Sequence, residues 1–457
     1  MSAGKSARMS ARVWGAALAA LALACAAPAR AQQSDAPDTS ALGRYFDALS
    51  DSSAARFGGL AAPADTAGLD SARVYAIAHP ARWRSARDGR HLELGPVFDF
   101  NRVDGPVLGG GFSIGQPARR LGRLSADVAD ATGPNIALGG ARWTRRLDRG
   151  DTRWELRLRG ARKTEAIDRE QGEHGLAAIG AFLFGNDRTH YLQRDGARVR
   201  LSREGHVLRL VGQYRDELES ARATTATWSA FGRRARLPYN LPAANGRARE
   251  LAGELLWRVP GSPIVAQLQH ATSGEALNSA FEYRRTRVSA GADVALGRTF
   301  ALVPQAEYGA LTTGFVPQAA FFLGGPHTLR SLPADSLGGT RLALARLELV
   351  LVRDPFDLLH LPHPIMFPVQ LAAFAAAGAV WGRDPYGGPT RPGGDWPHAG
   401  GWRSEVGLSL MYQPGFPEPT TFVRFNWAAP VGPGAHGSKL TLALTRGLDL
   451  VGVFERE

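Results

Sequence analysis

The chain has 457 residues, of which 44% are hydrophobic and 54 are glycine, and it carries a formal net charge of +12. Beyond residue 31 no stretch reaches the roughly 18 unbroken apolar residues of a membrane-spanning helix, which excludes a helical membrane protein. Two classes remain, a soluble β protein and a membrane β-barrel, and hydropathy alone does not separate them.

Residues 1–31 predict a cleaved secretion signal. A positively charged start precedes an apolar core at 13–24, and a small-x-small cleavage site ends at Ala31. The single cysteine, Cys25, lies inside this segment, so we expect no disulfide or thiol chemistry in the mature chain. Acylation of Cys25 is the alternative, but Ala22-Leu23-Ala24 is a poor match to a lipoprotein lead-in.

Removal of the signal lowers the formal charge from +12 to +8, because it takes away four basic and no acidic residues. Nearly all remaining cations are arginines that alternate with apolar residues along the expected strands. Nucleic-acid binding would need basic clusters with stacking aromatic residues. The pattern instead predicts a charged barrel lining and solvated loops, with no nucleic-acid partner.

Residues 32–90 differ from the rest of the chain. The apolar spacing at 42–49 predicts a short helix, and a second helical piece at 70–79 is stopped by Pro80. No strand pattern is present in this segment. We interpret it as either a short periplasmic adaptor or a plug in the lumen of a barrel.

From His91 onward the hydrophobic period becomes two. Residues 152–164 are an example, with Trp154, Leu156 and Leu158 alternating with charged side chains. One apolar and one charged face per strand also suits a half-buried soluble sheet. The strand length decides between the two, because soluble strands average about five or six residues and membrane-barrel strands need about 9–11.

The segment 402–413 gives a length check. Its outer face is expected to run from Trp402 to Tyr412, ten residues apart, with Arg403 and Glu405 on the other face. Ten residues span about 33 Å, and a tilt near 45° converts this into a height of about 23 Å. Since the apolar band of an outer-membrane barrel is about 25 Å tall and edged by aromatic residues, the segment favours a membrane wall.

These patterns predict an all-β fold, a transmembrane antiparallel β-barrel of about 16 strands that covers residues 91–457. The expected strands are 91–101, 106–116, 121–131, 135–147, 152–164, 193–203, 206–217, 250–260, 263–272, 283–297, 300–314, 340–353, 369–381, 402–413, 420–430 and 438–450. Long connections are expected at 165–192, 218–249 and 382–401. The stretch 175–185 is open between loop, helix and an additional strand.

The segment 320–352 carries the most specific motif. An apolar approach leads to Gly324-Gly325-Pro326, then Leu329-Arg330-Ser331-Leu332, a Gly-Gly pivot and a long strand. This resembles the bacterial surface-antigen superfamily, which includes BamA/TamA-like outer-membrane assembly factors and two-partner secretion transporters. The resemblance implies that residues 315–339 fold into the barrel and that Arg330 lies against acidic wall residues. The family's tetrapeptide is Leu/Val-Arg-Gly-Phe/Tyr, so the arginine is kept here while the glycine and the aromatic residue are not.

The resemblance also implies the partners of Arg330. The acid on the next strand is present as Glu348, with Arg346 on the same face. The family's second acid belongs to a Phe-x-Asp-x-Gly phrase, and Ala376 takes the place of this aspartate. We therefore predict a loop lock with a single acid, Arg330 with Glu348, weaker than that of the family. The alternative is that Arg330 is a solvated loop charge.

The implied function is insertion or assembly of outer-membrane proteins, or translocation across the outer membrane. Family members of this kind carry POTRA modules, and we expect none in residues 32–90. The implied partners are outer-membrane lipids, client polypeptides and the barrel-assembly machinery, which would read the C-terminal aromatic Phe454. A passive pore without insertase activity is the alternative, and a lipid-acting barrel enzyme is a third, distant possibility.

Two patterns resemble enzyme motifs. Ser113 lies in a G-x-S-x-G sequence, but a true nucleophile elbow is a strand-to-helix turn and no helix is expected here. His360 and His363 are spaced like metal ligands, yet two prolines and the absence of a third ligand nearby favour a loop. We expect no catalytic residue, no metal site and no cofactor.

Overall fold

The structure is a computed structural model. It describes residues 83–85, 92–118, 120–167, 181–182, 185, 187–226, 228–231, 237–361, 369–394, 396–412, 421–432 and 437–446. The predicted signal peptide, the 42–49 and 70–79 helices, most of 175–185, His363 and Phe454 lie outside the described residues.

Long antiparallel strands form the wall of the molecule. Eleven come first: β2 (Leu92–Asn101), β3 (Gly105–Gly115), β4 (Arg123–Ala131), β5 (Ile136–Arg149), β6 (Thr152–Ala166), β7 (Tyr191–Glu204), β8 (Leu208–Ala221), β9 (Gly246–Arg258), β10 (Ile264–Ser273), β11 (Tyr283–Ala292) continued by β12 (Val294–Leu296), and β13 (Phe300–Thr312). Five follow a long connection: β16 (Arg341–Leu351), β17 (Val369–Trp381), β18 (Arg403–Tyr412), β19 (Thr421–Val431) and β20 (Lys439–Arg446). Each strand pairs with its neighbour in this order, with β11 and β12 both paired to β13.

The prediction of about 16 strands, eleven before the arginine loop and five after it, is confirmed when β11 and β12 are counted as one interrupted strand. Three short strands were not predicted. β1 (Trp83–Ser85) pairs with β2 in a segment for which no strand was expected, and β14 (Phe321–Leu323) pairs with β15 (Leu337–Gly339) inside the connection. They were missed because three-residue strands are too short to display a period of two. Within the described ranges, no helix has the length and apolarity needed to cross a membrane.

The two faces of the wall differ in polarity as the alternation predicts. On β18, Val406, Leu408 and Leu410 are 45%, 58% and 38% exposed on the outer face, while Glu405 and Ser409 are each 2% exposed on the inner face. Most strands repeat this arrangement, because side chains alternate between the faces of a sheet. An apolar outer surface of this kind suits lipid. The fold is therefore an all-β barrel of the outer-membrane type.

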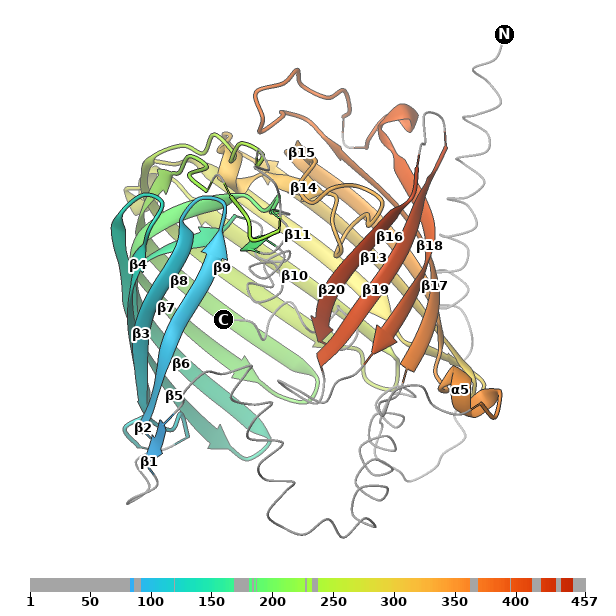
Figure 1. The fold of residues 1–457 in the computed structure, drawn as a ribbon, viewed down its shortest axis with the longest axis horizontal. Helices are drawn as coiled ribbons and strands as arrows, with labels where there is room; N and C mark the ends of the chain where they lie inside the picture. Colours follow the sequence, from blue (N-terminus) through green and yellow to red (C-terminus); the bar gives the residue numbers. More distant parts are fainter. Residues whose placement is uncertain are drawn as a thin grey trace.

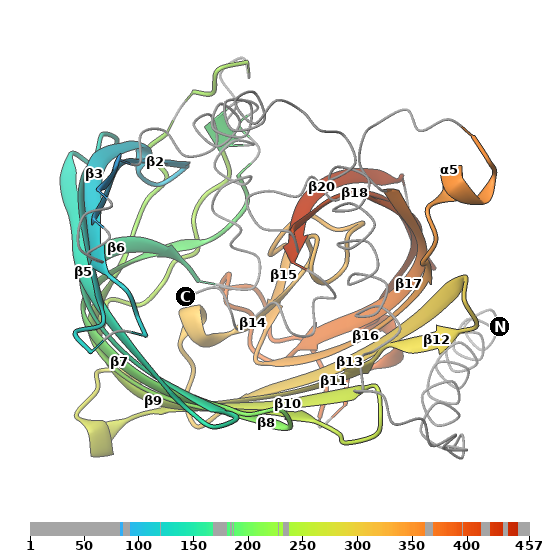
Figure 2. The same cartoon turned by 90° about the horizontal axis from the view of Figure 1, so that it is seen from below.

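The sheet curls around an interior that holds part of the chain (Figures 1 and 2). Figure 1 shows β2 and β20 as the two edges of the curved sheet. Among the described residues β1 extends the sheet beside β2, and no pairing joins either strand to β20. The described strands thus form a curved wall with a seam between the first and last strands.

The connections divide between the two ends of the barrel. One end has the long ones, at residues 167–190, 222–245, 313–340 and 382–402, the last with η3 (Ala399–Gly401). The other end has short turns such as 150–151 and 205–207, and the 352–368 connection with α5 (Pro355–Leu358). Short periplasmic turns and long external loops are typical of outer-membrane barrels. The end with the long connections is therefore the external one.

Candidate functional site

The connection between β13 and β16 packs against the inner face of the wall (Figure 2). It consists of η2 (Pro317–Ala319), the β14–β15 hairpin and the turn between these two strands. We call residues 313–340 the lumen loop. Its buried side chains, among them Phe321, Leu323 and Leu329, form one apolar cluster with wall residues of β9, β11, β13, β16 and β17.

The Gly-Gly-Pro motif makes the turn that presents Arg330. Gly324 and Gly325 have φ angles of 115° and 103°, which residues with a Cβ rarely adopt. The Gly324 N–H donates to Thr328 Oγ1 at 2.8 Å, and the Gly325 N–H donates to the Leu329 carbonyl at 3.0 Å. These bonds reverse the chain within a few residues and leave Arg330 directed at the wall.

A glycine on the wall provides the seat for the lumen loop. The Phe321 ring lies against Gly309 of β13, where a Cβ would come within 2.5 Å of the ring. The Arg285 guanidinium lies over the same ring, with its carbon 4.4 Å from the centroid. The missing side chain at Gly309 therefore leaves room for the aromatic ring against the wall.

Arg330 is 2% exposed, so it is not a solvated loop charge. Its Nη2 forms an ion pair with Glu348 on β16, and its Nε donates to the Pro326 carbonyl at 3.3 Å. The guanidinium carbon lies 4.2 Å from the centroid of the Phe374 ring on β17. The structure thus brings Arg330 and Glu348 together and adds a stacking partner that sequence reasoning missed.

A second acid binds the backbone of the lumen loop, in addition to the predicted pair of Arg330 and Glu348. Glu405 of β18, itself 2% exposed, accepts the backbone N–H of Arg330 at 2.9 Å and that of Ser331 at 2.6 Å. Glu405 is the direct cross-strand partner of Ala376, the position where the family's aspartate is absent. A carboxylate therefore reaches the loop from the adjacent strand. The pairing register, which is invisible in the sequence, decides this.

Glu348 lies between two guanidinium groups. Its second oxygen accepts a hydrogen bond from Arg424 Nη2 of β19 at 2.7 Å. Arg424 is held in turn by Ser409 at 3.1 Å and by Asn426 at 3.0 Å. A buried carboxylate with two cations is well compensated, because charge-assisted hydrogen bonds offset part of the cost of desolvation. Arg424 is the only basic residue on the inner face of the described part of β19. This isolated positive charge was the signal from which the sequence could have identified it.

The loop tetrapeptide Leu329–Leu332 connects the five wall strands that follow it. The tetrapeptide contacts Glu348, Phe374 and Glu405, as described above. In addition, the Leu332 carbonyl accepts a hydrogen bond from Lys439 Nζ of β20 at 2.9 Å. β19 joins through Arg424 and Glu348. The loop motif therefore links β16, β17, β18, β19 and β20, the five strands that curl around it in Figure 2.

A polar cluster at the external end ties the lumen loop to four other connections. Arg102 Nη2 and the Leu241 N–H donate to His190 Nδ1 at 2.9 and 3.1 Å, so the neutral imidazole carries its proton on Nε2. That Nε2 donates to Tyr386 Oη at 2.9 Å, and the Tyr386 hydroxyl donates to the Asp335 carbonyl of the lumen loop. We call these five residues the cap cluster. The cap cluster therefore attaches the lumen loop to the other connections at the external end of the barrel.

The cap cluster is expected to weaken in acid. Burial, together with the positive charge of Arg102, lowers the pKa of His190 to about 3, whereas an unfolded histidine titrates near 6.5. The unfolded state therefore takes up a proton first, and stability falls as the pH drops from about 6.5 toward 3. Burial raises the pKa of neighbouring Asp187, so protonation of this carboxyl opposes the effect of His190 on stability in acid. Asp187 is present in the wild-type protein and in the His190→Gln variant, so it contributes equally to both. His190→Gln should flatten the pH dependence of thermal unfolding in detergent, whereas His206→Gln, at an exposed turn, should not.

The remaining sequence candidates lie apart from this site. Ser113 is in β3, where it donates to Glu93 at 3.3 Å and accepts from Arg123 at 2.8 Å. His360 is exposed in the connection between β16 and β17. No group of three histidine, cysteine or acidic residues that could hold a metal ion occurs in the part of the chain that the structure describes.

No family model and no curated protein matches the chain. Among solved structures it is similar to BamA from Haemophilus ducreyi lacking POTRA domains 1–3, with 12% identity and a TM-score of 0.48 over 83% of this chain and 78% of that chain. CdiB from Escherichia coli is 13% identical, with a TM-score of 0.44 over 79% of this chain and 62% of that chain. CdiB from Acinetobacter baumannii is 11% identical, with a TM-score of 0.40 over 79% of this chain and 60% of that chain. Similarity at this level does not assign a family, so the proposals below rest on the chain's own residues.

Proposed function

We propose that the protein is an outer-membrane barrel of the surface-antigen type that inserts outer-membrane proteins or moves polypeptides across the outer membrane. The observation that carries the proposal is the lumen loop. Its arginine lies against Glu348, the partner that the sequence resemblance implies, and its backbone is held by a second acid, Glu405. A plain pore would not need a buried arginine that organises five strands.

The position of these five strands suggests how the protein would act. The lumen loop holds β20, whose outer edge has no partner among the described strands. An unpaired strand edge offers a row of N–H and C=O groups to an incoming chain. By fixing the curvature of β16 to β20, the loop would present this edge to a client polypeptide. The proposed partners are therefore unfolded β-strand clients, in addition to the lipids around the apolar outer face.

The proposed location is the outer membrane, reached by export and with help from the barrel-assembly machinery. We propose no cofactor and no catalytic residue. Phospholipid hydrolysis by the purified protein, seen as fatty acid released from vesicles, would contradict this part of the proposal.

Depletion of the protein should lower the abundance of other outer-membrane barrels several-fold in a membrane proteome. Re-expression of the wild-type chain or of Arg153→Gln should restore them, because Arg153 forms only an exposed ion pair with Asp148. Arg330→Ala should fail to restore them although it is present in the membrane. An unchanged proteome together with steady conductance in planar bilayers without any client would identify a passive pore instead.

A further inference from the structure

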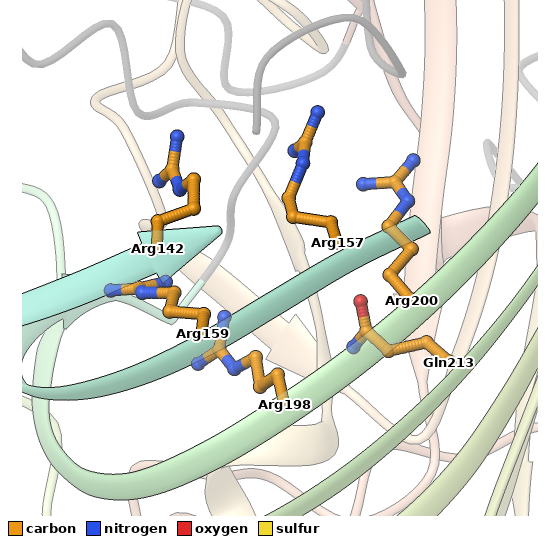
Figure 3. A pocket seen from close by; sticks show the side chains of 6 residues that line it. All are labelled: Arg142, Arg157, Arg159, Arg198, Arg200 and Gln213. Atoms are coloured by element: carbon orange, nitrogen blue, oxygen red, sulfur yellow. The ribbon is translucent and has the colours of Figure 1, made fainter. Parts of the chain in front are cut away.

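Charged side chains interrupt the apolar outer face of the wall near the external ends of β6, β7, β8 and β9. Each lies on the same face as an exposed apolar residue two or four positions away, such as Leu158 of β6 or Leu251 of β9. They are Arg162 of β6, Asp195 of β7, Asp216 of β8, and Arg247 and Arg249 of β9. We call this set the rim cluster. It is separate from the inner-face arginines of β5, β6 and β7, which line a small pocket (Figure 3).

Two strands place the rim cluster at the external edge of the apolar band. Trp154 of β6 and Trp257 of β9 are exposed on the outer face near the periplasmic turns. Arg162 follows Trp154 by eight residues, and Arg247 precedes Trp257 by ten. At about 3.3 Å per residue and a tilt near 45°, these separations correspond to heights of about 19 and 23 Å. Because the apolar band is about 25 Å tall, both arginines lie where lipid headgroups meet the external boundary.

The strand register gathers the rim cluster into one patch. Arg162 pairs across the sheet with Asp195, and its Nη2 lies 2.6 Å from this carboxylate. Asp216 accepts hydrogen bonds from Arg247 Nε at 2.6 Å and from Arg249 Nε at 3.2 Å. One carboxylate therefore serves two guanidinium groups on β9, and the rim cluster holds three arginines against two aspartates.

Two of these arginines remain open to a ligand. The side chains of Arg162 and Arg247 are 54% and 59% exposed. Each binds its aspartate through Nε and Nη2, on one edge of the guanidinium plane. The two N–H groups of Nη1 then point away from the carboxylate. An anion at the headgroup level can therefore approach both arginines without breaking their ion pairs.

We propose that the rim cluster binds a lipid of the external leaflet through phosphate groups of its headgroup. Arginine donates in pairs to phosphate oxygens, and the exposed side chains of Val199 and Leu251 on the same face would contact the acyl chains. Arg162 and Arg247 belong to one row across β6 to β9, about 14 Å apart at the backbone, which favours a headgroup with two phosphates. The site rests on the proposed outer-membrane location and does not require the insertion of clients.

Titration of the purified full-length protein in zwitterionic detergent with fluorescent diphosphorylated lipid A tests the proposal. Saturable binding is expected, and Arg247→Gln should weaken it about 10-fold, because charge-assisted hydrogen bonds to a phosphate are lost. Asp216 keeps Arg249 as a partner in this variant, so the fold should be retained. Asp216→Asn should instead strengthen binding about threefold, since it releases two guanidinium groups from their shared carboxylate. Monophosphorylated lipid A should bind the wild-type protein less tightly.

Arg203→Gln is the matched control, because Arg203 lies over Trp154 on the outer face near the periplasmic end of β7. It should change the affinity less than threefold. Displacement of the lipid by an equal concentration of inorganic pyrophosphate would overturn the assignment to a lipid. Non-saturable binding, or equal losses in Arg203→Gln and Arg247→Gln, would overturn the site itself. Membrane fractionation of the wild-type protein tests the location separately, so a failure of the lipid site is distinguishable from a failure of the proposed location.

Discussion

Glu348→Ala is expected to destabilise the barrel by about 3–5 kcal/mol, because removing one partner of a buried ion pair leaves uncompensated charge. Here two guanidinium groups, those of Arg330 and Arg424, would be left without this carboxylate. Arg330→Ala should cost less, about 1.5–3 kcal/mol, since Glu348 keeps Arg424 as a partner. Glu348→Ala should therefore lower the free energy of unfolding more than Arg330→Ala, because Glu348 lies between two cations.

Urea-induced unfolding of the barrel refolded in micelles measures both variants, and heat-dependent mobility in gels gives an independent readout. Glu93→Ala is the matched control, because Glu93 pairs with Arg123 in a partly exposed position and its loss should cost at most about 1 kcal/mol. Equal effects of Glu348→Ala and Glu93→Ala would show that the loop lock does not stabilise the fold.

Glu405→Ala is expected to release the lumen loop from β18, with a loss of about 2–4 kcal/mol for two charge-assisted hydrogen bonds. Both acceptor oxygens for the N–H groups of Arg330 and Ser331 disappear in this variant. Because Ala376 lies directly opposite Glu405, Ala376→Asp should restore part of the loss in the Glu405→Ala background. In the wild-type background the same change should destabilise, since two carboxylates would then face each other.

Ala376→Asp is thus expected to stabilise the Glu405→Ala variant and to destabilise the wild-type protein. A double-mutant cycle over these two positions tests this, with chemical unfolding and single-channel noise as readouts. Ala376→Asn in the Glu405→Ala background is the control for size and polarity without charge, and it should restore less than Ala376→Asp. If Ala376→Asp destabilises both backgrounds equally, the carboxylate of Glu405 does not replace the family's second acid.

The lumen loop is held from two directions, and this explains why several substitutions should act on one structural unit. Its tetrapeptide is bound to the wall through Glu348, Glu405 and Lys439. Its second half is bound to the cap cluster through the Asp335 carbonyl and Tyr386. Release of one attachment leaves the other in place, so single variants should loosen the loop without unfolding the barrel.

The strands and their orientation could be predicted from the sequence because they depend on local alternation. All sixteen expected wall strands have a counterpart, and the outward direction of Val406, Leu408 and Leu410 follows from their spacing alone. The family resemblance of the motif around Arg330 implied Glu348 as its partner, and Glu348 lies only 18 residues away on the following strand. In these cases the pattern and the contact belong to the same short stretch of chain.

The second acid and the second cation could not be predicted in this way. Glu405 is 75 residues from Arg330, and Arg424 is 76 residues from Glu348. Alternation predicted that Glu405 faces inward, but not that it lies opposite Ala376.

The sequence by itself determined the fold class, the face of the wall on which a residue lies and the existence of a loop with a central arginine. The fold class and the face follow from the two-residue period of strands, whereas the loop and its arginine were implied by the resemblance of the 320–352 motif to a known family. Only the tertiary structure decided which side chains meet, because that depends on the register between strands, and a shift of one residue would move every inward side chain to the other face.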